Sequence, residues 1–261
     1  MKLHYIKFFA VLTAAFFAFS CSNDDNASEQ LTGTGSLKVE FDQTYGDADF
    51  IQGAVYTNSN GEEVSISKAK YIVSNIVLTK EDGSTYTVPK SQSYFIIDEF
   101  TEASTLLNLP NIPAGNYTKI KFGIGVDQEQ FNQGATGQGD FLATAQDAGM
   151  MWSWSAGYKF LALEGMFTSS TQSTGAMYMV HTGKTGTDYN YAEITLNFPD
   201  KALVRTTITP QVHIMADLKQ VLDGTNKINL SEQAMVMGGA KLALVTANLA
   251  NMFEVHHVHN D

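Results

Sequence analysis

The sequence predicts a mainly β protein, a single antiparallel β-sandwich with one or two short helices near the C-terminus. Short runs of β-branched and aromatic residues are separated by turn signals, which is typical of sandwiches and barrels. A helical apolar period appears only in the last third of the chain. No repeat of solenoid length is present. We therefore expect one folded domain, residues 37–261.

The strands are expected to begin at Leu37, where SLKVEFDQ alternates apolar and charged residues. Two hairpins follow, with Asn60-Gly61 and Asp82-Gly83 in their turns, because these dipeptides accept a positive φ. The remaining expected strands lie in IPAGNYTKIKFGIGVD, YKFLALEGMF, GAMYMVHTG, YAEITLNFP and TTITPQVHIMADL.

Two helices are expected near the C-terminus. The first runs from about Asp217 to Leu222, with Gly224 as its stop signal. The second lies in GGAKLALVTANLANMF, where one stripe carries Leu242, Val245, Leu249 and Phe253.

The N-terminus predicts export and lipidation. Residues 1–20 combine a cationic start with the apolar run FFAVLTAAFFAF, which is typical of a signal peptide. Cys21 is the single cysteine, and Ala18-Phe19-Ser20-Cys21 resembles a lipobox with Ala in place of the usual Leu. We expect a lipid anchor on Cys21, a flexible tether over residues 21–36, and a location in the envelope of a Gram-negative bacterium, periplasmic or at the outer membrane.

Charge and cysteine content exclude several functions. The formal net charge of −11 argues against nucleic-acid binding, which needs clustered Lys and Arg. Beyond Cys21 there is no thiol for disulfides, thiolate ligands or thiol catalysis. The chain has no G-x-S-x-G, P-loop, H-E-x-x-H or EF-hand motif. The acidic residues around GATGQG match no calcium loop, so we expect a solvated loop there.

Histidines are concentrated at the C-terminus. His256, His257 and His259 lie in the last six positions, and His181 and His213 lie in expected strands. In an extended segment His257 and His259 project to one face and His256 to the other. Imidazole without thiolate suits copper or zinc, so the five histidines are candidate metal ligands. Taken singly, His181 and His213 are better explained as hydrogen-bonded histidines of the core or its rim, and the metal interpretation gains only from the C-terminal trio.

Both tryptophans lie in one stretch, GMMWSWSAGYKFLALEG, as the pair Trp152 and Trp154. Aromatics of this size usually fill cores. Beside a histidine metal site, however, tryptophan and methionine are also redox-active groups and neighbours for copper.

The chain resembles the MbnP-like proteins, exported copper-binding proteins first recognised beside methanobactin genes. The resemblance is carried by KYIVSNIVLTKEDGSTYTVP, IPAGNYTKIKFGIGVD, MMWSWSAGYKFLALEG, VHTGK, PQVHIMADL and MFEVHHVHND. It implies a β-sandwich, many of whose relatives are lipoproteins. It also implies a di-haem cytochrome c peroxidase-like partner that oxidises a tryptophan to kynurenine, which helps to form a copper site with histidines.

By motif, the oxidised residue would be Trp152 or Trp154. The histidine ligands would be His181, His213, His257 and His259, while His256 stands where relatives often have Asp. Relatives often read F-D-H in the first strand, whereas this chain reads Phe41-Asp42-Gln43.

Three hypotheses follow. The first is an anchored copper-binding protein for copper acquisition, storage or delivery. The second is a metal-free surface lipoprotein acting as an adhesin or glycan-binding subunit, with polar loops at residues 131–139 and 168–175. The third is an enzyme, which is not expected, because Glu164 and Asp217 are the only candidates for an acid or base beside a metal.

Overall fold

The structure is a computed structural model that describes residues 31–261. The predicted signal peptide, Cys21 and most of the predicted tether lie outside the described residues. Within residues 31–261 no helix is both long enough and apolar enough to cross a membrane.

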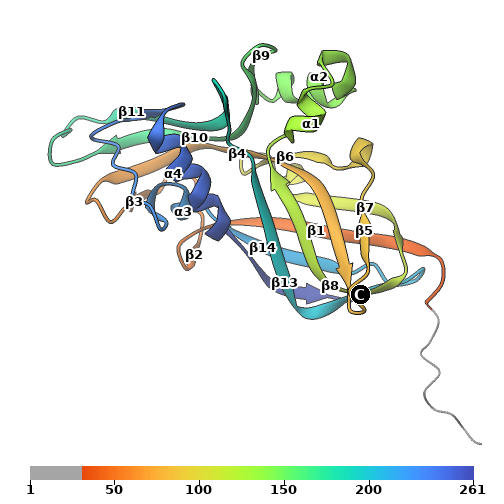
Figure 1. The fold of residues 1–261 in the computed structure, drawn as a ribbon. Helices are drawn as coiled ribbons and strands as arrows, with labels where there is room; N and C mark the ends of the chain where they lie inside the picture. The colour runs from red at the N-terminus through yellow and green to blue at the C-terminus, as the bar shows by residue number, and fades with distance from the viewer. Residues whose placement is uncertain (1–30) are drawn as a thin grey trace, which may run out of the picture. The chain divides into compact units, whose positions relative to one another are not determined.

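Residues 31–261 form two sheets, of which the smaller has five strands (Figure 1). Its order is β16-β14-β1-β2, and β7 also pairs with β1. The strands are β1 (Thr34–Tyr45), β2 (Ala48–Asp49), β7 (Leu106–Pro113), β14 (Gln211–Asp217) and β16 (Phe253–His259).

The larger sheet has eleven strands in the main order β12-β11-β10-β4-β8-β13. Strand β15 pairs with β11, β9 pairs with β10, and β3, β5 and β6 pair with β4. The strands are β3 (Val55–Thr57), β4 (Glu63–Lys80), β5 (Thr85–Thr87), β6 (Tyr94–Asp98), β8 (Gly115–Ile124), β9 (Met151–Ser153), β10 (Gly157–Thr168), β11 (Ala176–Thr185), β12 (Asp188–Tyr189), β13 (Ala192–Val204) and β15 (Met235–Val236).

The predicted mainly β sandwich is confirmed, but two strand pairs are parallel rather than antiparallel. Strand β1 runs parallel to β14, and β11 runs parallel to β15. Strands β1 and β14 are neighbours in the small sheet, although most strands of the large sheet lie between them in the sequence. A connection of that length allows the two strands to pair in either direction, parallel or antiparallel.

Aromatic rings fill the space between the sheets. Phe41 and Phe253 from the five-stranded sheet meet Tyr71 and Phe122 from the other sheet, with ring centroids 5.4–6.2 Å apart and the rings edge to face. Such pairs add to the stabilisation that comes from burial alone. Phe253 is the first residue of β16, so the last strand is anchored in the centre of the core.

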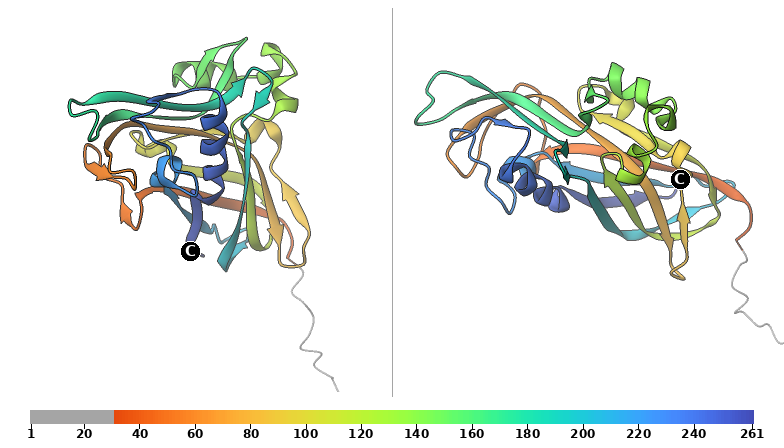
Figure 2. Two further views of the ribbon diagram at one scale, coloured as in Figure 1. Left: turned by 60° about the vertical axis from the view of Figure 1, so that its left-hand side comes forward. Right: turned by 45° about the horizontal axis from the view of Figure 1, so that its top comes forward.

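Helices are not confined to the C-terminal third, contrary to the prediction. The expected acidic loop contains α1 (Gln128–Phe131) and α2 (Phe141–Asp147), and they cover a second apolar cluster on the outer face of the large sheet (Figure 2). Asp127 caps α1 by accepting a hydrogen bond from the Gln130 N–H. These helices are too short for their period to be visible in the sequence, and tertiary packing stabilises them.

The expected C-terminal helices are present as α3 (Lys219–Asp223) and α4 (Ala240–Asn248). Four short 3₁₀ segments occur in the described chain, η1 (Lys90–Gln92), η2 (Glu102–Ser104), η3 (Ala135–Gln138) and η4 (Leu249–Asn251). The expected hairpin turns are confirmed, because β3 pairs with β4 across Asn60-Gly61 and β4 pairs with β5 across Asp82-Gly83.

The first strand begins at Thr34, so the last residues of the predicted tether belong to the fold. Thr34 and Gly35 pair with Pro113 and Ile112 of β7. A side chain at Gly35 would overlap the carbonyl oxygen of Arg205, which explains the glycine.

Candidate metal centre

Strands β14 and β16 bring four histidines together at the edge of the small sheet. His213 pairs with His257 across the two strands, and their ring centroids lie 4.6 Å apart. The rings of His257 and His259 are 4.5 Å apart, as expected for alternate residues of one strand. The predicted common face of His257 and His259 is therefore confirmed.

His256 does not point away from this group, as the simple alternation predicted. The register shifts between His213 and Ile214, which pairs with Val255, so His256 is an extra residue in β16. Such a bulge turns a side chain that would otherwise face the opposite side. The Nδ1 atoms of His256 and His257 lie 2.8 Å apart. One ligand nitrogen from each of His213, His256 and His257 lies within 4.8 Å of the others.

Two carboxylates of β1 flank His213. Because β1 and β14 are parallel and in register, Glu40 lies beside His213. The Nε2 atom of His213 is 3.4 Å from Asp42 Oδ2 and 3.8 Å from Glu40 Oε2. Burial raises the pKa of Asp42, with His213 opposing that shift. The sequence did not identify these two residues, because only the non-local pairing of β1 with β14 brings them to the histidines.

The cluster satisfies two physical requirements of a metal site. The Nδ1 atom of His213 is buried and has no hydrogen-bond partner among the described residues. Its other nitrogen faces a carboxylate, which is the arrangement that orients metal-bound histidines. Burial, with repulsion from His213, His259 and His256, lowers the pKa of His257. The neutral imidazole, which is the form that binds metal, is thereby favoured.

His181, the fifth candidate ligand, lies outside this cluster. It belongs to β11 of the large sheet, well separated from the C-terminal end of β16 (Figure 1). Its Nε2 atom is 2.9 Å from Glu164 Oε1, which also accepts a hydrogen bond from Lys68 at 2.7 Å. Burial lowers the pKa of His181, as do Lys159 and Lys68, although the bond to Glu164 opposes this.

The two tryptophans have different neighbours. The Trp152 ring lies 6.1 Å from that of His181, and a Cβ on Gly183 would come within 2.9 Å of its Cζ3 atom. Trp154 instead stacks on Phe131 of α1, 5.0 Å away. Trp152 is therefore the tryptophan beside a histidine, and Trp154 belongs to the outer apolar cluster.

Gln43, which stands where relatives often have histidine, faces the core. It is only 3% exposed, and its amide donates to the Phe41 carbonyl and accepts from Tyr71 Oη at 3.3 Å. Asp42 precedes it and faces His213 on the outer side. Gln43 and the histidine cluster therefore lie on opposite faces of the small sheet.

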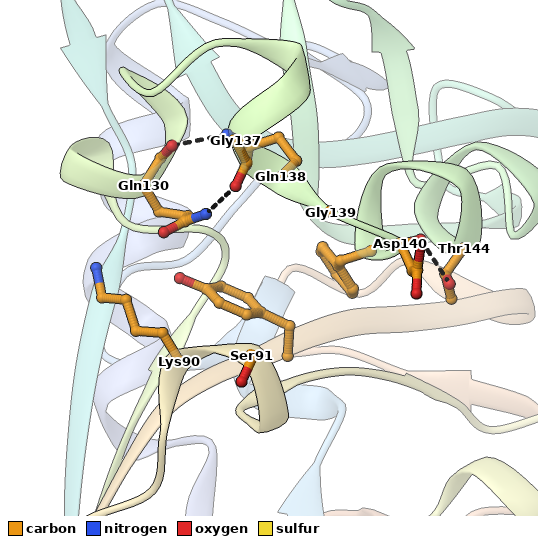
Figure 3. A pocket seen from close by; sticks show the side chains of 10 residues that line it. Lys90, Ser91, Gln130, Gly137, Gln138, Gly139, Asp140 and Thr144 are labelled. Atoms are coloured by element: carbon orange, nitrogen blue, oxygen red, sulfur yellow. Dashed lines mark hydrogen bonds between the residues drawn. The ribbon is translucent and has the colours of Figure 1, made fainter.

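A separate cavity of about 520 Å³ lies beneath the α1–α2 segment (Figure 3). Its lining combines the aromatic rings of Tyr94 and Phe141, 5.3 Å apart, with amide, hydroxyl and glycine groups. Gln130 and Gln138 fix the wall, because their side chains donate to the carbonyls of Gly137 and Gln130 at 2.7 Å. Lys90 and Asp140 are the charged residues of the lining.

Fold and site together define a β-sandwich protein with a histidine cluster of metal-ligand spacing at one sheet edge. The chain belongs to the MbnP family, whose sequence profile matches residues 34–238. It is also similar to the solved structure of MbnP from Methylosinus trichosporium, with 15% identity, a TM-score of 0.47, and coverage of 79% of this chain and 82% of that one. Among curated proteins the comparison returned no match.

The matched range has a consequence for the site. Trp152, Trp154, His181 and His213 lie inside residues 34–238, whereas the three terminal histidines lie beyond them. The assignment of His256, His257 and His259 therefore depends on the geometry of this chain.

Proposed function

We propose that this protein binds copper outside the cytoplasm through His213, His256, His257 and His259, for copper acquisition, storage or delivery. One observation carries the proposal: two strands far apart in sequence bring three imidazole nitrogens within 4.8 Å of one another, with a fourth ring adjacent. Imidazole ligands suit copper and zinc, and copper(II) binds such sites more tightly than zinc does. The copper-binding function that the family resemblance implies favours copper.

His181 is not included in this ligand set. Its Nε2 atom is bonded to Glu164, and that carboxylate is already paired with Lys68. A cation would meet lysine charge here rather than further ligands.

We propose a binding role and not a catalytic one. Both acid–base candidates of the sequence have other partners. Glu164 bonds to His181 and Lys68, and Asp217 accepts from the Gly46 and Lys219 N–H groups and from Gln220.

The test is the double variant His257→Ala/His259→Ala. Tight copper binding, measured against a competing chelator, should be lost while circular dichroism shows an intact fold. His181→Gln is the matched control and should bind copper as the unmodified chain does. Unchanged affinity in the double variant would refute the assignment.

Trp152 is the tryptophan that we propose is converted to kynurenine. Trp154 is stacked on Phe131 in the outer apolar cluster, whereas Trp152 is not part of that cluster, which supports the choice. Two peroxide equivalents would add two oxygen atoms across the indole C2–C3 bond with release of two waters. Hydrolysis would then release formate and leave kynurenine. The oxidant would act through the di-haem peroxidase-like partner that the family resemblance implies.

Tandem mass spectrometry of the peptide containing both tryptophans, isolated from the native host, tests this step. Kynurenine should be found at Trp152, and Trp152→Phe should abolish the modification while Trp154→Phe retains it. Kynurenine at Trp154 alone would reverse the assignment.

Export and anchoring through Cys21 complete the proposal. In the native host, Cys21→Ser should move the protein from the envelope membranes to the soluble fraction. Membrane association that survives this change would argue against a lipid anchor.

A second candidate function is recognition of a saccharide in the cavity beneath α1 and α2. Aromatic faces with fixed amide and hydroxyl groups suit a neutral polyhydroxylated ligand. A glycan array tests it, with Ser91→Trp as a variant that fills the cavity. Binding that is absent, or that persists in this variant, would exclude the cavity.

A further inference from the structure

Methionines are exposed at one end of the large sheet. Among the described residues, four of the eight large hydrophobic side chains that are exposed are methionines: Met166, Met177, Met235 and Met237. Met177 is half exposed, at 50%. They belong to β10, β11 and β15 or follow directly on β15, where the β10–β11 hairpin extends outward (Figure 2). Scattered exposed apolar residues need no explanation, but a group of one residue type does.

The strand register brings these side chains to one face. Met166 pairs with Met177, and Met179 pairs with Met235 on its other side. Tyr178 and Val180 are fully buried against the core, so the alternating Met177 and Met179 face outward.

The spacing allows the sulfurs to meet. Directly opposed residues have Cβ atoms about 5 Å apart, and alternate residues of one strand are about 7 Å apart. Methionine has three rotatable side-chain bonds and adapts its sulfur position readily. Met177 and Met179 can therefore converge on one point together with Met166 or with Met235, whereas Met166 and Met235 lie two strands apart and cannot both reach it.

Glu164 pairs with Met179 on the same face, but its carboxylate is already bonded to Lys68 and His181. The thioethers themselves must therefore provide the affinity for an ion. The chain as a whole carries a net charge of −11.

We propose that the row of Met166, Met177, Met179 and Met235 forms a second metal site, in which Met177 and Met179 bind one ion together with Met166 or Met235. The site is specific for a soft monovalent cation of the copper(I) class. Neutral thioether sulfurs select copper(I) over harder ions. This thioether row shares no ligand with the histidine cluster, so it does not rest on the function proposed above. Because thioethers do not protonate in the physiological range, the row should retain its ion at pH values where histidines release theirs.

The experiment uses the mature chain and silver(I), a redox-inert probe with the same ligand preference. At about pH 5, histidines of ordinary pKa are largely protonated. Silver(I) should still bind, and in protein labelled with ¹³C at the methionine methyls the four resonances of the row should shift. Those of the buried Met150 and Met252 should stay unchanged. The absence of a shift in the row would overturn the proposal.

A variant with leucine at all four positions (Met166→Leu, Met177→Leu, Met179→Leu and Met235→Leu) provides the second arm. Leucine is close to methionine in volume, so the fold should persist. Affinity for silver(I), and for copper(I) under anaerobic conditions, should fall about tenfold or more, which corresponds to about 1.4 kcal/mol. Met252→Leu is the matched control and should have no effect.

Two further outcomes separate this site from others. The His257→Ala/His259→Ala variant should lose copper(II) binding at neutral pH but keep silver(I) at low pH. If the leucine variant keeps its silver(I) affinity while the chain changes from a self-associated to a monomeric state, the row is a protein-contact surface and the proposal is wrong.

Discussion

The two histidine regions begin from similar chemistry and end in different environments. His213 and His181 each lie on a strand, each has a buried Nδ1 without a hydrogen-bond partner in residues 31–261, and each has a carboxylate near Nε2. His213 is then joined by three more imidazoles, whereas His181 is joined by Trp152 and by Lys68 through Glu164. The residues around an imidazole, rather than the imidazole itself, therefore decide whether a region suits a cation.

Lowering the pH should have the largest effect on copper affinity, and it should show which of the two histidine regions binds copper. Copper competes with protons for the neutral imidazoles, so affinity should fall about a hundredfold or more between pH 7 and pH 5. Because His257 has a lowered pKa, its neutral form persists to lower pH than usual. Chelator competition across this range measures the loss in the unmodified chain and in His181→Gln, which should behave alike. A pH-independent affinity would remove the histidine cluster as the copper site.

The same shifts predict a change in the stability of the metal-free protein. The folded pKa values of His181 and His257 lie below their unfolded values. The unfolded chain therefore binds more protons, and stability should decline as the pH falls below about 6.5. Thermal unfolding of the metal-free chain between pH 7 and pH 5 checks the sign.

Phe253→Ala should affect the terminal cluster through the core. Removing a buried phenylalanine costs about 3–5 kcal/mol, and Phe253 connects β16 to the aromatic centre of the sandwich. Chemical denaturation measures the loss, and copper affinity should weaken with it because β16 loosens. Stability close to that of the unmodified chain would show that the strand is not held by this residue.

Asp127→Asn should act on the opposite region, where α1 carries Phe131 against Trp154. The Asp127 carboxylate accepts from Asn75 and Tyr94 at 2.8 Å, from Gln130 N–H at 2.9 Å and from Lys90 at 3.1 Å. Against the effect of burial, these bonds lower its pKa from 3.8 to about 2. The ionised form then contributes about 2 kcal/mol at neutral pH, which declines as the pH falls through 3.8 toward 2. Denaturation at neutral pH should show this loss, with copper affinity unchanged.

Substituting one carboxylate in each histidine region should have the smallest effects on copper affinity and stability. Asp42→Asn should lower copper affinity about tenfold, because a carboxylate that orients a ligating histidine typically contributes that much or more. Glu164→Gln should leave copper affinity unchanged and cost about 1 kcal/mol of stability, through the weakened bonds to His181 and Lys68. Titration calorimetry with copper and thermal unfolding measure both. Copper affinity that falls in Glu164→Gln but not in Asp42→Asn would show that copper binds at His181 instead.

The sequence by itself determined the strand-rich class, the turns at Asn60-Gly61 and Asp82-Gly83, and the common face of His257 and His259. These features depend on the period of the chain and on the backbone freedom of a few residues, which are local properties. Only the tertiary structure decided the parallel pairing of β1 with β14, the bulge that turns His256 toward His213, and the separation of His181 from the cluster. Register and bulges are set by hydrogen bonds between strands that are often distant in sequence, as β1 and β14 are, so the sequence of one strand does not specify its partners.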